Sequence, residues 1–294
     1  MLKTMKIAIF ANTYRPFILT PLRTLIDFFT EKGVTLMLEQ ELYKFVVEHD
    51  DCCSDTIEII SNDDFSANIA LSIGGDGTFL STAAHIGKKQ IPVLGINTGR
   101  LGFLADVPVE NILPALESLL SSNYDIEERT LLFVETSDHT QLDNPYALNE
   151  VSVLKQDSSS MISIHTYLNG EAIHTYQADG LLISTPTGST AYSMSVGGPI
   201  VVPQAQNILL SPVASHSLNV RPLIVPDNWI IELDVKSRSH CYQVALDGRS
   251  VILSEDTKLR ITKADFCVKV IKQRNHTFFH TLKSKLMWGM DKRN

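Results

Sequence analysis

The chain has 294 residues, 44% of them hydrophobic and 20% charged, which is the composition of a globular protein long enough for two domains. Its formal net charge of −8, without a basic run, argues against nucleic-acid or membrane partners, and no segment approaches the ~18 apolar residues of a membrane span, so a cytoplasmic protein is expected. Since there is no CxxC pair, four free thiols are expected at Cys52, Cys53, Cys241 and Cys267.

Up to about Ser122, short apolar runs alternate with stretches that carry apolar residues at helical spacing. Buried strands are predicted over Lys6–Phe10, Ile69–Ile73 and Ile91–Ile96. Helices are predicted over Pro21–Lys32, Thr78–Ile86 and Val109–Leu120. This alternation of strands and helices predicts a parallel sheet covered by helices on both faces.

From about Arg129 onward the pattern is typical of β-structure, so a domain boundary is expected between Ser121 and Arg129. Pairs of short strands flank Asn169-Gly170 and Asp247-Gly248, which are typical of tight two-residue hairpin turns. The remaining elements expected here are strands over Gly180–Ser184, Ile230–Val235 and Phe266–Ile271, a loop over Ser137–Asn144, and a final helix over Phe278–Trp288.

The first candidate site is the segment Gly74–Thr78, GGDGT, between a predicted strand and a predicted helix. Glycines allow positive φ angles and close approach of the backbone to a ligand, and the N–H groups of a helix N-terminus suit phosphate oxygens. A carboxylate beside phosphates is explained if Asp76 contacts a metal ion or takes a proton from an attacking hydroxyl group. The alternative is a glycine-rich turn in which Asp76 forms an Asx-type cap.

Three further segments carry polar groups suited to a nucleotide. Thr185–Tyr192 supplies hydroxyl groups and a flexible glycine before a helix expected to start near Thr190; its alternative role is an ordinary N-cap and loop. Asn149-Glu150 could read an adenine edge and grip ribose hydroxyls, although a dipeptide by itself is weak evidence. Asn97–Phe103 is a second glycine-rich turn after a predicted strand, at the end of the sheet where open α/β sheets bind ligands.

These segments, in this order, resemble the NAD kinase family along nearly the whole chain. Gly74–Thr78 is similar to the GGDG motif of that family, Gly95–Leu104 to its second glycine segment, and Asn149-Glu150 to its NE pair. Asp179–Tyr192 resembles the longest family motif. Further matches are Gly197–Pro199 and His216–Pro222.

The resemblance implies an α/β plus β fold. A Rossmann-like α/β domain is expected over residues 1–125, a β-rich, sandwich-like domain over 126–275, and a C-terminal helix that returns to the first domain over 276–294. The active site would lie between the domains. It implies transfer of the γ-phosphoryl group of ATP to the 2′-hydroxyl of the adenosine ribose of NAD, which gives NADP. It also implies a divalent metal ion, usually Mg²⁺, and a homodimer or homotetramer.

By the same resemblance, Asp76 is the base for the 2′-hydroxyl, and the ATP phosphates face Gly74, Gly75, Gly77 and Thr78. NAD would be held by Asp76, Gly77, Asn149, Glu150, Asp179, Thr190, Ala191, Tyr192, Ser193, Met194 and Ser195. Three positions depart from the family pattern, and their contacts with NAD rest on position alone: Ser160, Gln177 and Arg249. No dedicated metal ligand is predicted, because no HExxH or similar spacing occurs, and structural or surface roles are expected for the histidines.

Two other functions share some of these features. A lipid kinase of the diacylglycerol or sphingosine type resembles the chain in its GGDGT turn and in its domain order, but it lacks the segment Thr185–Tyr192. A non-catalytic NAD-binding sensor would keep the pocket, but binding alone does not need the carboxylate of Asp76 beside phosphates. A dehydrogenase would need a G-x-G-x-x-G motif, which is absent from the sequence.

Overall fold

The computed structural model describes residues 5–13, 18–49, 57–99, 101–157, 160–274 and 276–289. The chain divides into a first unit, Met1–Glu128 with Val268–Asn294, and a second unit, Arg129–Cys267. No helix in these described ranges is long and apolar enough to cross a membrane. Cys241 and Cys267 are outside any disulfide in the described part of the chain, whereas Cys52 and Cys53 lie outside the described residues.

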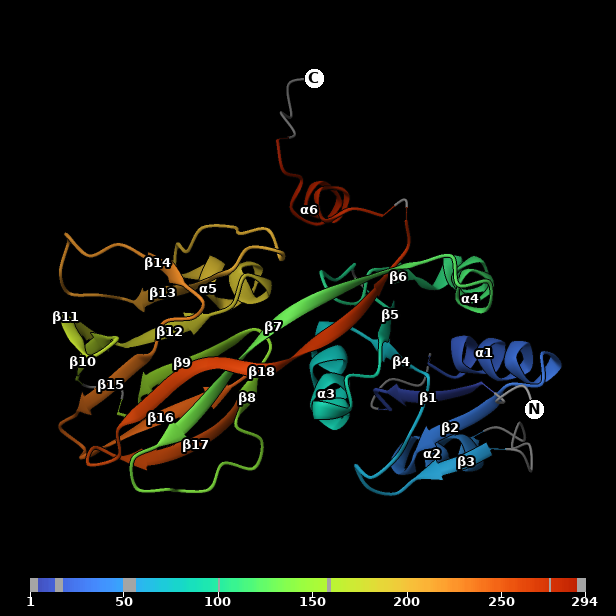
Figure 1. Cartoon of the computed structure of the whole chain (residues 1–294), viewed down its shortest axis with the longest axis horizontal. Coiled ribbons are helices and arrows are strands. Elements are labelled where there is room, and N and C mark those ends of the chain that lie inside the picture. Colours follow the sequence, from blue (N-terminus) through green and yellow to red (C-terminus); the bar gives the residue numbers. More distant parts are fainter. Residues whose placement is uncertain are drawn as a thin grey trace. The chain divides into compact units, whose positions relative to one another are not determined.

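The first unit contains a parallel sheet in the order β5-β4-β1-β2-β3 (Figure 1). Its strands are β1 Lys6–Ala11, β2 Thr35–Glu39, β3 Ile57–Ile60, β4 Ile69–Gly74, β5 Val93–Asn97 and the short β6 Val107–Pro108, which pairs with β5. Its helices are α1 Leu19–Glu31, α2 Gln40–His49, α3 Asp76–Ile86, α4 Ile112–Leu120 and α6 Phe278–Leu286. The segment β2-α2-β3 was not predicted from the sequence.

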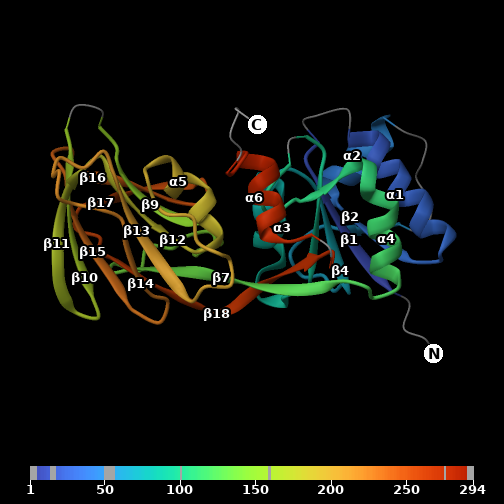
Figure 2. The same cartoon turned by 90° about the horizontal axis from the view of Figure 1, so that it is seen from above.

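Alternate residues of the central strands face opposite sides of this sheet, as strand geometry requires. In β1, Ile7 and Ile9 enter a core with residues of α1 and α4, which lie side by side in Figures 1 and 2. Phe10 points to the other face, where its ring stacks on His85 of α3 with 5.6 Å between the centroids. The prediction of a parallel sheet covered on both faces is therefore confirmed.

The second unit encloses its core between two antiparallel sheets (Figure 1). One sheet has the order β14-β13-β12-β9-β16-β17, and the other includes β11-β10-β15-β18 together with β7 and β8. The bounds are β7 Asp125–Thr136, β8 Tyr146–Ala147, β9 Glu150–Lys155, β10 Ile162–Leu168, β11 Glu171–Ala178, β12 Gly180–Ser184, β13 Asn207–Val213, β14 Leu223–Pro226, β15 Ile231–Lys236, β16 Cys241–Leu246, β17 Arg249–Ser254, β18 Leu259–Lys272, and the short helix α5 Tyr192–Ser195. The α/β plus β fold expected from the sequence is confirmed.

Both predicted hairpin turns are confirmed by backbone angles. Asn169 and Gly170 have φ of 50° and 82°, and they join β10 to β11. Asp247 and Gly248 have φ of 48° and 84°, and they join β16 to β17. Two consecutive positive φ angles give the type I′ twist that suits a two-residue hairpin, which is why Asn-Gly and Asp-Gly are found there.

Candidate active site

The helix that follows the GGDGT turn has no side-chain cap at its N-terminus. β4 ends at Gly74 and α3 begins at Asp76, and the N-cap residue, Gly75, has no side chain that could accept a hydrogen bond from the helix. The carboxylate of Asp76 accepts hydrogen bonds from N–H groups of the loop 103–105 and not of α3, so the Asx-type cap considered for this residue is wrong. Gly75 and Gly77 need no positive φ, and a Cβ added to either would meet nothing within 4 Å. These two glycines leave open space around the first N–H groups of α3, and N–H groups at a helix N-terminus suit anionic ligands.

The carboxylate of Asp76 is held by the loop that follows β5. Its Oδ1 accepts hydrogen bonds from the N–H groups of Leu104 at 2.9 Å and Ala105 at 3.0 Å, and its Oδ2 accepts one from Phe103 at 3.0 Å. A Cβ at Gly102 would collide with Oδ1, so only glycine permits this approach. The side chain of Asp76 is nevertheless 30% exposed. The second glycine-rich segment predicted from the sequence thus positions the acidic group of the first.

The same loop is anchored from its other side by a buried ion pair. Lys272 Nζ lies 2.6 Å from Asp106 Oδ2, and His276 Nδ1 lies 3.0 Å from the same oxygen. Burial by itself would raise the pKa of Asp106, but the charge of Lys272 and the hydrogen bond with His276 outweigh it and lower that pKa. Asn97 adds a bond from its amide to the carbonyl of Ala105 at 3.2 Å. These contacts fix the backbone that surrounds Asp76.

A cavity of about 350 Å³ in the first unit borders this loop. Its lining includes Asn97, Gly99, Leu101, Asp106, His276 and His280. A larger cavity of about 470 Å³ in the second unit contains none of the residues predicted to form the site.

In the second unit, Asp247, which the sequence predicts only as a turn residue, holds the backbone of the Asn149-Glu150 pair. Asp247 accepts hydrogen bonds from the N–H groups of Leu148 at 2.7 Å, Asn149 at 2.8 Å and Glu150 at 3.1 Å. Burial raises the pKa of Asp247, and the three N–H groups and Arg249 offset only part of that rise. Nothing in the sequence distinguishes this Asp from an ordinary hairpin aspartate.

Glu150 is a largely buried acid without a partner for one oxygen. Its Oε2 is buried and has no hydrogen-bond partner among the described residues. Burial, and then the charge of Asp247, raise the pKa of Glu150 to about 7. An unsatisfied buried carboxylate is costly in a folded protein, and groups of this kind cluster at ligand sites.

Many hydroxyl groups of the segment Thr185–Tyr192 serve the fold itself. Thr185 is fully buried and donates to the carbonyl of Leu148 at 2.6 Å, while Ser189 donates to the carbonyl of Pro186 at 2.7 Å. A Cβ at Gly188 would collide with the carbonyl of Asn149. The segment therefore packs tightly against the Asn149-Glu150 pair. The helix expected near Thr190 is a 3₁₀ helix over residues 187–190 followed by the single turn of α5.

The remaining predicted NAD contacts differ in their accessibility. Asp179 forms an ion pair with Lys155 at 2.6 Å and is 36% exposed, and Tyr192 is 39% exposed. Ser193 is fully buried and shares a 3.0 Å hydrogen bond with the hydroxyl of Ser211. Thr190, Ala191 and Met194 are half-buried, and Ser195 is exposed.

Of the three positions that depart from the family pattern, two form hydrogen bonds within the second unit. Gln177 on β11 donates to Ser163 Oγ on β10 at 2.8 Å. Arg249 donates to the carbonyl of Tyr146 at 2.6 Å, which ties the start of β17 to β8. Ser160 is half-buried, and its neighbours Ser158 and Ser159 lie outside the described residues.

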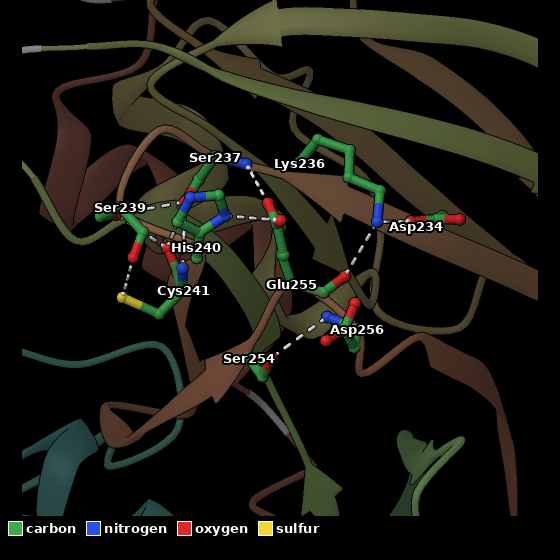
Figure 3. Close-up of polar contacts among 9 residues, drawn as sticks. All are labelled: Asp234, Lys236, Ser237, Ser239, His240, Cys241, Ser254, Glu255 and Asp256. Atoms are coloured by element: carbon green, nitrogen blue, oxygen red, sulfur yellow. Dashed lines mark hydrogen bonds and ion pairs between the residues drawn. The ribbon is translucent and has the colours of Figure 1, made fainter.

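A separate polar cluster lies near the turn between β15 and β16, as Figure 3 shows. His240 Nδ1 lies 2.7 Å from Glu255 Oε1, and the hydrogen bond to Glu255 and then its charge raise the pKa of His240. Ser237 N–H donates to the second oxygen of Glu255 at 3.2 Å. Because His240 is 80% exposed, this cluster lies at the surface, where it joins the turn after β15 to the turn after β17.

Comparison with known proteins places these features in one family. The ATP-NAD kinase N-terminal domain family matches residues 7–124, and the ATP-NAD kinase C-terminal domain family matches residues 148–273. An NAD kinase of Bacteroides fragilis is 49% identical over 289 residues, covering 98% of this chain and 100% of that protein.

Two solved structures share the fold. Yeast NADH kinase, complexed with NADH, aligns with a TM-score of 0.90 and 21% identity over 99% of this chain and 89% of its own. An NAD kinase from Archaeoglobus fulgidus, in complex with ATP, aligns with a TM-score of 0.75 and 24% identity over 96% of this chain and 99% of its own.

Proposed function

The chain belongs to the NAD kinase family, and on that premise we propose which of its residues perform the family's reaction. The chain is an ATP-dependent kinase of NAD that transfers the γ-phosphoryl group of ATP to the 2′-hydroxyl of the adenosine ribose, giving NADP. Asp76 is proposed as the base that accepts the proton of this hydroxyl. The observation that supports it is a partly exposed carboxylate, fixed by three N–H groups, at the start of a helix that has no side-chain cap.

On the donor side, the turn Gly74–Thr78 is proposed to hold the ATP phosphates through backbone N–H groups. Phosphoryl transfer depends mainly on positioning and on neutralising charge, and the N-terminus of α3 offers both N–H donors and the positive end of the helix dipole. The open space at Gly75 and Gly77 supports this proposal. The NAD kinase from Archaeoglobus fulgidus, which shares the fold, was crystallised in complex with ATP.

Gly77→Ala is expected to raise KM for ATP at least ~10-fold without loss of stability. The added Cβ meets nothing within the protein, and alanine in a helix is favoured over glycine by roughly 0.5–1 kcal/mol, so the free energy of unfolding should stay level or rise. Steady-state kinetics and urea denaturation measure both effects. Ser81→Ala, at an exposed position of the same helix, is the control. An unchanged KM for ATP in Gly77→Ala would contradict close approach of a phosphate group.

On the acceptor side, residues of the second unit are proposed to hold NAD. The buried carboxylate of Glu150 lacks a partner for Oε2, and ribose hydroxyl groups are donors of the right kind. Asn149 would contact adenine, and Asp179 and the exposed face of the segment Thr190–Ser195 would complete the pocket. Since the hydroxyl of Ser193 is bonded to Ser211, Ser193 would act through its backbone. Yeast NADH kinase, which shares the fold, was crystallised in complex with the dinucleotide NADH.

Asp247→Asn is expected to raise KM for NAD roughly 10-fold and to lower the free energy of unfolding by about 1–3 kcal/mol. An amide oxygen cannot replace two carboxylate oxygens as acceptor for three buried N–H groups, so the Asn149-Glu150 backbone would shift. Asp256→Asn, which makes the same chemical change at an exposed position, is the control. Equal kinetics for the two variants would remove Asp247 from the positioning of NAD.

The described side chains are compatible with a divalent metal ion that arrives bound to ATP. Among the described residues, no three His, Cys, Asp or Glu side chains gather as metal ligands, and Mg²⁺ is commonly bound by one or two carboxylates together with substrate phosphates. Asp76 is the carboxylate proposed to lie near it. When bound, Mg²⁺ would neutralise phosphate charge. The homodimer or homotetramer that the family resemblance implies, and the cytoplasmic location expected from the sequence, stay predictions.

The proposal is tested by supplying ATP, MgCl₂ and NAD to the purified chain and measuring NADP with an NADP-specific dehydrogenase. NADP is expected, and EDTA should abolish its formation. A folded chain that binds NAD and forms no NADP with any donor or divalent metal would instead be the sensor considered above.

A further inference from the structure

The GGDGT turn carries a negative side chain and no positive one. Gly74–Thr78 has a single ionisable residue, Asp76, whereas ATP brings several negative charges to the same place. Phosphate-binding loops of the Walker type solve this with a lysine inside the loop. A positively charged side chain for this turn, in addition to the charge of Mg²⁺, has to come from another part of the chain.

The fold brings a lysine to Asp76 from the last helix. Lys285 Nζ lies 3.3 Å from Asp76 Oδ2, although the two residues are 209 positions apart in the sequence. The same ammonium group lies 4.6 Å above the centroid of the Phe103 ring. Phe103 also donates its N–H to Asp76 Oδ2, so the three groups form one cluster.

The position of the lysine follows from how α6 is anchored. The Phe103 ring packs against Phe278 in the first turn of α6, with 6.0 Å between the ring centroids. His276, just before the helix, bonds to the buried Asp106 at 3.0 Å, and Thr277 caps the helix by accepting the N–H of His280. The anchors of α6 therefore attach to the same loop that holds Asp76.

We propose that Lys285 is the phosphate-binding cation of this site and that its ammonium group bridges Asp76 and the phosphates of ATP. An ammonium group has three donors, and the bond to Asp76 uses one of them. With a side chain that is 32% exposed, Lys285 can reach an incoming ligand. Its charge offsets that of Asp76, which would otherwise repel the phosphates. This inference rests on the proposed function, in which Asp76 faces ATP.

The test compares Lys285→Met with Lys283→Met, a matched change at an exposed lysine of the same helix. In Lys285→Met, KM for ATP is expected to rise about 10- to 100-fold, since a charge-assisted phosphate contact is lost, while KM for NAD stays within about twofold. Lys285→Arg should recover most of the loss because it keeps the charge. Lys283→Met should match the wild type.

A second readout separates phosphate binding from a structural ion pair. The affinity for the nonhydrolysable ATP analogue AMP-PNP with Mg²⁺, measured by calorimetry, should fall in Lys285→Met by the same factor as the rise in KM. An exposed ion pair contributes little to stability, so the melting temperature should move by less than about 4 °C. Unchanged affinity for AMP-PNP, or equal kinetics in the two Met variants, would make the pair with Asp76 purely structural and overturn the proposal.

Failure of the base assignment gives a different pattern. If Asp76→Asn kept a normal kcat while Lys285→Met still weakened AMP-PNP binding, the base would be wrong and the role of Lys285 would stand. If Asp76→Asn lost turnover while Lys285→Met bound AMP-PNP normally, the base would stand and Lys285 would have no part in binding ATP.

Discussion

Asp76→Asn is expected to lower kcat by about 10²- to 10⁴-fold, which is the usual contribution of general-base catalysis. An amide of the same shape cannot accept the proton of the ribose 2′-hydroxyl. Because the change removes the proton acceptor of the chemical step, KM for ATP and for NAD should change much less than kcat. Steady-state kinetics with NADP detection gives all three values.

Asp76 also accepts three backbone hydrogen bonds, so its loss could act through the loop. Asn97→Ala is the control, because it removes two other bonds of the same loop, to the carbonyl of Ala105 and from the N–H of Gly99, and leaves the carboxylate in place. If loop disorder caused the effect, the two variants would lose similar activity. The base assignment requires Asp76→Asn to be at least ~10-fold slower than Asn97→Ala.

Glu150→Gln is expected to stabilise the protein at pH 8 while weakening NAD binding. Burial, and then the charge of Asp247, raise the pKa of Glu150 from its ordinary 4.5 to about 7. Between these values the folded protein holds a proton that the unfolded chain has lost, so stability falls as pH rises from about 4.5 to about 7 and stays low above it. A pKa shift of this size corresponds to a loss of at most roughly 3 kcal/mol in the free energy of unfolding.

Glutamine carries no charge that burial would penalise. The free energy of unfolding of Glu150→Gln should therefore exceed that of the wild type by up to roughly 3 kcal/mol at pH 8, and by little near pH 4.5. Urea denaturation at the two pH values measures the difference. At pH 8, KM for NAD should rise about 10-fold or more, since a neutral amide accepts hydroxyl protons less strongly than a carboxylate. A variant that is less stable at pH 8 and binds NAD normally would show that Glu150 is a structural residue.

The sequence predicted the elements whose patterns are local. The strand Lys6–Phe10, the two type I′ turns and the alternation in the first domain all follow from neighbouring residues, and the structure confirms them. β2 and α2 were missed because no turn residue separates them: Glu39 ends the strand and Gln40 begins the helix.

The contacts around the candidate site that escaped prediction join distant parts of the chain. Asp247 lies 97 to 99 positions from the N–H groups it binds, and Lys285 lies 209 positions from Asp76. Lys155, the partner of Asp179, is equally unmarked in sequence. Conversely, the hydroxyl of Thr185 looked available for a ligand but is buried against Leu148. Residue types at a motif predict chemistry, but only packing shows which side chains remain free to perform it.

The most direct test of Asp76 as the base is a single-turnover measurement with saturating ATP, Mg²⁺ and NAD, in which rapid quenching follows transfer of the labelled γ-phosphoryl group into NADP. Such a measurement isolates the chemical step from binding and product release. The base assignment predicts a transfer rate at least ~10²-fold lower in Asp76→Asn than in the wild type. Equal transfer rates in the two proteins would contradict it.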